Sequence, residues 1–323
     1  MNVNTETPAQ REVLTALEPQ VRQFMQRHRD ARKLWMPSEL LPTGGEHEAE
    51  QLALRQRAQG LPDSVRVALA LNLLTEEGLP HFHRLVAQYM GHDGVWAEWN
   101  NLWTAEEDRH GCVLRDYVRD TRMFDMVALE RMQYQYVESG FNPQWHGDPY
   151  RLLAYTSLQE KATQTSHSNA GRLAGQYEPV LQRILAHISG DESRHYAFYR
   201  DSFSAVLKAD TNRALAALAA VVPALAMPGH NIEGFAQMSE VERRAGIYGP
   251  REYLRLVEDL IKHWAIDTMT NLSAMGRSAQ EKVMELPGRL SKMADYIERK
   301  THSRSFSFEV IYKRAFEMAN AAG

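Results

Sequence analysis

Residues 103–111 read WTAEEDRHG and residues 191–195 read DESRH, so the pattern Glu-x-x-His occurs twice, at Glu107/His110 and at Glu192/His195. Three residues along an α-helix turn through about 300°, which places both side chains on one face, about 4.5 Å apart along the axis. One helix can therefore offer a carboxylate and an imidazole to the same metal pair. A single match would mean little, because about one is expected by chance in a chain rich in Glu and His.

A second glutamate precedes each motif at nearly the same distance: Glu76 lies 31 residues before Glu107, and Glu160 lies 32 residues before Glu192. Spacing leaves open whether Glu76 or its neighbour Glu77 is the first member. The doubled pattern is typical of a two-metal site in a four-helix bundle, where two helices give one Glu and two give Glu-x-x-His. Two divalent cations would neutralise the four carboxylates, and the mixed donors suit iron or manganese.

Helical periodicity extends over most of the chain, and it predicts an all-α fold: a ferritin-like four-helix bundle with additional flanking helices. The longer predicted helices span 63–90 (loosened at Pro80), 95–120, 125–138, 150–174 and 178–208. The shorter ones span 46–57, 212–226, 239–245, 251–272, 279–284 and 288–300, and only 305–312 resembles a strand. No Gly/Ser-rich linker divides the chain. We expect one domain over 1–323, with N-terminal helices (1–62), a metal-binding bundle (63–208) and flanking helices (209–323).

Composition excludes several classes of protein. A net charge of −4 argues against a dedicated nucleic-acid binder, and the single Cys112 excludes an internal disulfide or a cage of cysteine ligands. The longest apolar run, 214–227, has 14 residues, whereas a membrane span needs about 20. Residues 1–10 resemble neither a secretory nor a transit signal. We therefore expect a soluble, cytoplasmic protein without a membrane span.

A basic segment lies near the N-terminus. Residues 21–35 read VRQFMQRHRDARKLW, with the cations Arg22, Arg27, Arg29, Arg32 and Lys33 against a single acid. The segment is either the solvent-exposed face of an amphipathic helix or a docking patch for an acidic partner.

Beyond these motifs, the chain resembles the soluble acyl-acyl-carrier-protein desaturases of the stearoyl type. The stretches that carry the resemblance are KLWMP (33–37), LTEEGLP (74–80), WTAEEDRHG (103–111), YTSLQEKAT (155–163) and DESRH (191–195), with later similar pieces at 227–230, 264–280 and 286–287. The resemblance runs from about residue 15 to 315. The tryptophan-to-histidine motif is specific to this family among ferritin-like proteins.

The resemblance implies an enzyme that removes two hydrogens from a fatty acyl chain held as a thioester on acyl carrier protein, leaving a cis double bond. Oxygen and two electrons from a ferredoxin-type donor would be consumed, and the enzyme would be a homodimer. Two iron ions per subunit, Fe²⁺ when reduced, would be bound by Glu76, Glu107, His110, Glu160, Glu192 and His195. Glu77 and Glu106 would be neighbours that bind no metal.

Further roles come from the same resemblance. Thr163 would assist oxygen activation or proton delivery, although a core threonine bonded to its own backbone is an equal reading. Asp191 would orient His110 with Trp35 nearby, His167 would be a supporting or core histidine, and Trp103 would transfer electrons or simply pack in the core. The acyl tunnel would be lined by Leu85, Tyr89, Pro143 and Leu152, or these would only be core residues. The basic segment, with Arg194, would meet the acidic carrier protein.

Two other functions are compatible with these residues. A di-iron hydroxylase or N-oxygenase could use the same site. A ferritin-like module could bind a carrier protein without turnover, although competent ligands at all six positions count against that reading.

Overall fold

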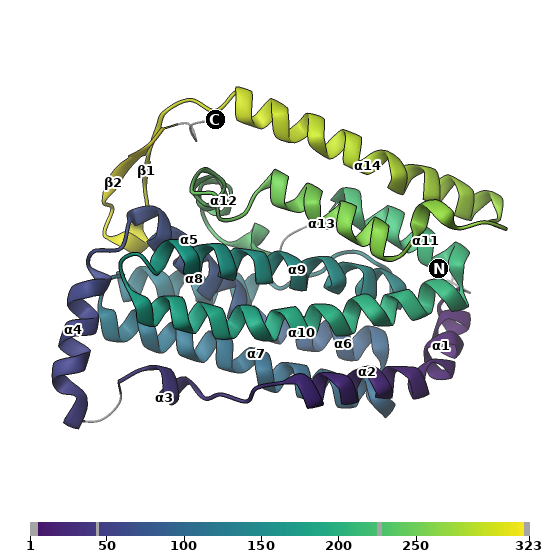
Figure 1. The fold of residues 1–323 in the computed structure, drawn as a ribbon, viewed down its shortest axis with the longest axis horizontal. Coiled ribbons are helices and arrows are strands. Elements are labelled where there is room, and N and C mark those ends of the chain that lie inside the picture. The colour runs from purple at the N-terminus through teal and green to yellow at the C-terminus, as the bar shows by residue number, and fades with distance from the viewer. Residues whose placement is uncertain (1–5, 43–44, 225–227, 320–323) are drawn as a thin grey trace.

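The computed structural model describes residues 6–42, 45–224 and 228–319, which are predominantly helical, so the prediction of an all-α fold is confirmed (Figure 1). The helices are α1 (Glu6–Ala16), α2 (Glu18–Ala31), α3 (Pro37–Leu40), α4 (Glu48–Ala58), α5 (Asp63–Glu76), α6 (Leu79–Met90), α7 (Gly94–Thr121), α8 (Met126–Ser139), α9 (Pro149–Ala174), α10 (Pro179–Ala209), α11 (Thr211–Val221), α12 (Phe235–Arg244), α13 (Pro250–His263) and α14 (Ala274–Arg299). Two short strands, β1 (Arg304–Ser307) and β2 (Ala315–Met318), follow them.

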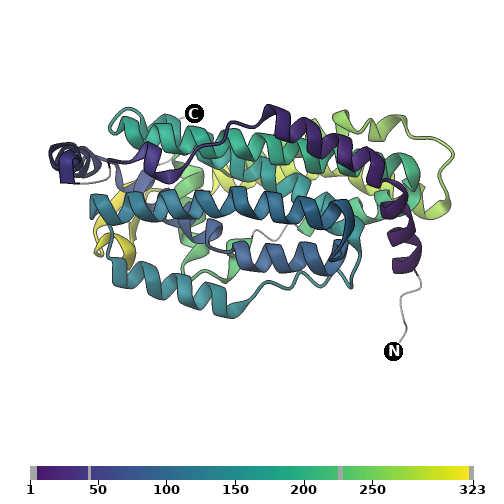
Figure 2. The same ribbon diagram turned by 90° about the horizontal axis from the view of Figure 1, so that it is seen from below.

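Four long helices form the core of the molecule. Helices α5, α7, α9 and α10 pack against one another, and α9 and α10 contact each other along much of their length. Helix α2 packs across α7 and α10 on one side (Figures 1 and 2). Helices α11, α13 and α14 cover the opposite side, and α12 lies between α5 and α14 (Figure 1).

The bundle has two apolar clusters with polar residues between them. On α7, buried residues from 95 to 103 belong to the first cluster and those from 113 to 118 to the second. On α10, the order is reversed, with 181–188 in the second cluster and 198–207 in the first. Both Glu-x-x-His motifs fall in the intervals. Apolar packing at each end therefore supports a buried polar layer in the middle.

The predicted helix over 63–90 is wrong as a single element, because the chain forms α5 and α6 with a break at Glu77 and Gly78. Pro80 has no N–H, and its ring would clash with the carbonyl four residues earlier, which belongs to Glu76. Helix α5 therefore ends at Glu76, and Pro80 occupies the first turn of α6. The break places Glu76 at the end of a helix.

The C-terminal predictions need three corrections. The helices expected at 279–284 and 288–300 are one continuous α14, in which Pro287 is tolerated because Val283, Leu286 and Leu290 hold the helix in the core. The helix predicted over 251–272 ends at His263, near Ala265 at φ 51°. The strand predicted over 305–312 ends at Ser307 as β1, which pairs with β2 in a hairpin that places Phe306 opposite Phe316.

Other boundaries lie close to the predictions. The expected helix 212–226 is observed as α11 and a short 3-10 turn, while residues 225–227 lie outside the described part of the chain. Within the described ranges, no helix is both long and apolar enough to cross a lipid bilayer.

Candidate metal centre

The six predicted metal ligands converge in the polar layer. They form two groups whose donor atoms lie within 4.8 Å of one another, and Glu107 and Glu192 belong to both. The first group adds Glu76 and His110, and the second adds Glu160 and His195. None of the six residues is more than 8% exposed. The arrangement is two adjoining sites with two shared carboxylates.

The donor atoms are short of hydrogen-bond partners, as expected for atoms that face a cation. His195 Nδ1 lies 2.8 Å from Glu107 Oε1 and 3.6 Å from Glu160 Oε2, and His110 Nδ1 lies 3.3 Å from Glu192 Oε1. Nevertheless both Nδ1 atoms and both Glu160 oxygens are buried without a well-formed hydrogen bond. These atoms are close together but do not point at one another. The donor set therefore fits bound divalent cations.

The carboxylates of the cluster differ in the direction of their pKa shifts. Burial, followed by the charge of Glu192, raises the pKa of Glu160 well above its ordinary value. Burial also pushes the pKa of Glu76 upward, but hydrogen bonds from His110 and His167 outweigh it and lower that pKa to about 2. Carboxylates this close cannot all remain charged unless cations neutralise them.

Asp191 lies behind His110, and its carboxylate contacts four donor side chains. Its Oδ2 accepts hydrogen bonds from Trp35 Nε1 at 2.9 Å, Arg109 Nη2 at 3.0 Å and His110 Nε2 at 3.2 Å. Arg194 pairs with the other oxygen. The contacts with Trp35 and His110 are those that the family resemblance implied. They hold the His110 ring so that Nδ1 faces the cluster.

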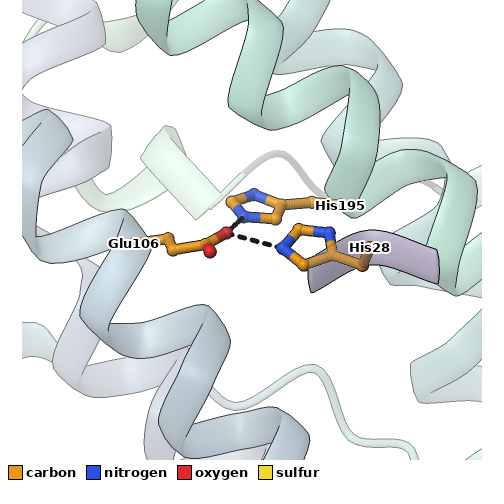
Figure 3. A group of neighbouring side chains, drawn as sticks. All are labelled: His28, Glu106 and His195. Atoms are coloured by element: carbon orange, nitrogen blue, oxygen red, sulfur yellow. Dashed lines mark hydrogen bonds and ion pairs between the residues drawn. The ribbon is translucent and has the colours of Figure 1, made fainter. Parts of the chain in front are cut away.

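Glu106 has the equivalent place behind His195 (Figure 3). Its Oε2 lies 2.9 Å from His195 Nε2 and 2.8 Å from His28 Nε2 of α2. Distances of this length are hydrogen bonds, and they orient His195 as Asp191 orients His110. Helix α2 thus reaches the centre with its buried face.

Sequence reasoning did not single out His28. It lies in the basic segment, but Val21, Met25 and His28 are all buried at the i, i+4, i+7 spacing of one helix face. That spacing could have identified His28 as a buried residue from the sequence. Arg109 was also missed; it is buried, stacks on Trp35 and pairs with Asp191.

The structure separates Glu76 from Glu77. Glu77 points away from the cluster, where it accepts hydrogen bonds from Arg115 Nε at 2.7 Å and Gln133 Nε2 at 2.6 Å. His167 lies behind Glu76, with Nε2 2.7 Å from Glu76 Oε1. This favours Glu76 as the ligand and His167 as its support.

Thr163 and Trp103 both lie beside the cluster. Thr163 Oγ1 lies 3.2 Å from Glu192 Oε2, and it also contacts the carbonyls of Gln159 and Glu160 in its own helix. Thr163 therefore contacts both a predicted metal ligand, as a role at the metal centre requires, and its own backbone, as a core threonine would. Trp103 is 2% exposed and packs edge-on against Tyr199.

A cavity of about 940 Å³ adjoins the cluster, which is within the usual range for a ligand site. Glu76, Glu107, Glu192 and Thr163 form part of its wall, and its apolar wall includes Phe82. The predicted tunnel residues are not in this wall: Leu85, Tyr89 and Leu152 are buried in the first apolar cluster and Pro143 is half-buried. Their role as a tunnel stays a prediction.

The predicted docking residues pair with different acidic residues or are exposed. Arg22 pairs with Glu98, Arg27 with Asp201, and the half-buried Arg32 with Glu106. Arg29 and Lys33 are exposed near them. Arg22, Arg27 and Arg29 of α2 are exposed while His28 is buried, so this helix has a cationic outer side and an inner side at the metal centre. Arg32, which follows α2, shares Glu106 with His28. Arg194 pairs with Asp191 behind His110.

Glu242 of α12 lines the same cavity and was not found from the sequence. It is 7% exposed, and burial alone raises its pKa to about 8. In the unfolded chain this carboxyl has its ordinary pKa of about 4.5, so as the pH rises it ionises there before it ionises in the folded protein. Its contribution to the free energy of unfolding is therefore full below pH 4.5 and is lost as the pH rises toward 8.

We therefore expect Glu242→Gln to match the native protein in unfolding free energy near pH 4.5 and to exceed it by about 3 kcal/mol at pH 7. Denaturant unfolding at both pH values measures the difference. A Gln variant that follows the native pH dependence throughout would show that Glu242 ionises normally in the folded protein.

Comparison with known proteins agrees with this geometry. The model of the family described as "Fatty acid desaturase" matches residues 9–312. An acyl-[acyl-carrier-protein] 6-desaturase of Thunbergia alata is 37% identical, over 81% of this chain and 72% of its own. A stearoyl-[acyl-carrier-protein] 9-desaturase of Gossypium hirsutum is 33% identical, over 90% and 75%. The crystal structure of DesA2 from Mycobacterium tuberculosis H37Rv superposes with a TM-score of 0.62 at 23% identity, over 83% of this chain and 99% of that one.

A helical bundle in which two Glu/His groups share Glu107 and Glu192 beside a large cavity is typical of the carboxylate-bridged two-metal proteins. The chain belongs to the fatty acid desaturase family. The resemblance to acyl-acyl-carrier-protein desaturases seen in the sequence is thereby confirmed.

Proposed function

We propose that this enzyme introduces a cis double bond into a fatty acyl chain held as a thioester on acyl carrier protein. The observation that carries the proposal is the shared wall: the apolar cavity is bounded by Glu76, Glu107 and Glu192, so an acyl chain in it lies against the metal ligands. Two irons, held by Glu76, Glu107, His110, Glu160, Glu192 and His195, would supply the oxidation by O₂.

The reaction balances with one oxygen molecule. Two C–H bonds break, and one of their two electron pairs forms the π bond of the alkene. The other pair, with two electrons from an external donor, two protons from the substrate and two protons from solvent, reduces O₂ to two waters. We expect a ferredoxin-type protein as donor, and the homodimer and cytoplasmic location predicted from the sequence remain predictions.

The chain's own residues orient the metal ligands, bind the substrate and shield the reacting carbons from water. Asp191 and Glu106 fix the two imidazoles. The apolar wall excludes water from the reacting carbons, and Thr163 can hold a proton at Oγ1 next to Glu192 Oε2. The exposed α2 cations suit the acidic surface and phosphate of a carrier protein.

Product mass tests the proposal. Iron-reconstituted enzyme would be supplied with a reduced ferredoxin, O₂ and acyl-carrier-protein thioesters of several chain lengths. Desaturation removes about 2 mass units, whereas hydroxylation adds about 16. Thioesters recovered unchanged, or carrying oxygen, would refute the proposal.

Thr163→Val gives a more local prediction. Valine keeps the shape of the side chain but removes the hydroxyl next to Glu192. We therefore expect a normal iron content and a turnover number about 10-fold below that of the native enzyme. Thr165→Val is the matched control, because in the described part of the chain that hydroxyl donates to Lys161 O of its own helix and to no metal ligand. Iron assay and steady-state kinetics measure both. Loss of iron in Thr163→Val, or equal turnover in both variants, would contradict the role.

A further inference from the structure

The cavity extends well beyond the metal ligands. On the bundle side its wall includes Asn72 of α5 and Ser166 of α9. On the other side it is closed by the C-terminal helices, including Ser239 and Glu242 of α12, Tyr248 of the following loop and Leu290 of α14. A ligand that reaches the metal centre through this space must therefore pass groups from both halves of the molecule.

Glu242 is a buried carboxyl group that the fold does not satisfy. Its Oε1 is buried with no hydrogen-bond partner among the described residues. The cations beside it in α12 have other partners: Arg243 donates to Thr301, and Arg244 pairs with Glu240. Burial raises the pKa of Glu242 to about 8, so the side chain is mainly a neutral carboxylic acid at pH 7.

Tyr248 presents a second unsatisfied group to the same cavity. Its hydroxyl is buried and has no hydrogen-bond partner among the described residues. Burial and the neighbouring Tyr253, Glu252 and Glu242 raise its pKa, so the hydroxyl stays neutral. Glu242 and Tyr248 together offer two neutral hydrogen-bond donors.

Some other polar residues of the wall are satisfied internally. Tyr253 donates to Val222 O at 2.6 Å, and Ser166 donates to Asn72 Oδ1 at 3.0 Å. On the bundle side, Trp103 Nε1, Glu107 Oε1 and Gln159 Oε1 also lack a hydrogen-bond partner among the described residues, next to or within the metal centre. Away from the metal centre, on the side of α12, the unsatisfied groups are Glu242 Oε1 and the Tyr248 hydroxyl. A buried donor without a partner reduces stability, which makes a ligand the natural partner.

We infer that Glu242 and Tyr248 form a polar binding site within the cavity that donates hydrogen bonds to an oxygen of the acyl thioester substrate. The inference rests on the proposed function, because it takes the cavity as the place of the acyl thioester. The oxygen comes either from an amide or thioester carbonyl of the carrier arm, or from an oxygen substituent on the acyl chain. A neutral carboxylic acid and a neutral hydroxyl can each donate a hydrogen bond to a carbonyl or hydroxyl oxygen.

The test compares binding by the iron-loaded enzyme without an electron donor, so that no turnover occurs. The probes are S-palmitoyl pantetheine, palmitoyl ethyl thioester and a hydroxylated palmitoyl ethyl thioester. We expect Glu242→Leu and Tyr248→Phe each to weaken binding of at least one of the thioesters about 10-fold, and Glu242→Gln to weaken binding of the same thioester less than about threefold. Gln237→Leu, on the exposed side of α12, is the control that should leave binding unchanged.

The probes distinguish the sources of the oxygen. A loss confined to the pantetheine thioester identifies the arm amides, a loss for every thioester identifies the thioester carbonyl, and a loss only for the hydroxylated chain identifies a chain substituent. Melting temperatures at or above the native value show that the variants fold. Unchanged affinity for every thioester in folded Glu242→Leu and Tyr248→Phe would overturn the inference while leaving alkene formation by the native enzyme intact. A native enzyme that makes no alkene would instead refute the proposed function.

Discussion

Glu192→Ala is expected to lose both iron ions and all measurable alkene formation. Glu192 belongs to both groups of donors, so its removal opens the two sites at once and leaves His110 Nδ1 without a carboxylate that it now faces. His195→Ala should have the same effect on activity, because it removes the nitrogen donor of one site. Iron per chain and product mass measure these outcomes. Unchanged iron in purified Glu192→Ala would refute the ligand set.

The adjacent pair Glu76 and Glu77 provides a matched control. Glu76→Ala should lose iron, because Glu76 belongs to the first donor group. Glu77→Ala should keep it, because that carboxylate pairs with Arg115 and Gln133 outside the cluster. Equal iron contents in the two variants would mean that the cluster does not distinguish these neighbours.

Asp191→Ala should be the most damaging change outside the ligand set. It leaves Arg109 buried without its partner, which costs about 3–5 kcal/mol of stability, and it removes the acceptor that orients His110. Loss of such a partner lowers metal affinity roughly 10–100-fold. Denaturant unfolding of the metal-free protein and competition with a chelator measure the two effects separately.

Asp201→Ala on the same helix is the control for Asp191→Ala. Asp201 pairs with the exposed Arg27, and such surface pairs contribute about 0–1 kcal/mol. An Asp191→Ala protein as stable and as tight for iron as Asp201→Ala would contradict the orienting role of Asp191.

The metal centre was the most predictable part of the molecule. A helix of 3.6 residues per turn brings Glu107 to His110 and Glu192 to His195 from local geometry alone. The repeated preceding glutamates predicted the long-range pairing, because four inward carboxylates require one common cation site. Spacing did not distinguish Glu76 from Glu77. That distinction depends on the end of α5, which Pro80 determines through the carbonyl four residues before it.

The errors arose where tertiary packing outweighed local signals. Pro287 reads as a helix break, yet α14 continues through it because its apolar residues are buried against α11 and α13. His28 was missed because its segment is dominated by exposed cations, although its inner face is buried beside Glu106. Glu242 has no sequence signal, since its isolation is created by helices brought together from distant parts of the chain.

The most direct test of the account locates the metals. Crystals of iron-loaded protein, measured for anomalous scattering at the iron edge, should show two peaks per chain roughly 3.5–4 Å apart. One should lie beside Glu76 and His110 and the other beside Glu160 and His195, with Glu107 and Glu192 contacting both. A single peak, or a peak between His28 and Glu106 in place of the hydrogen bond described above, would contradict the two-metal centre.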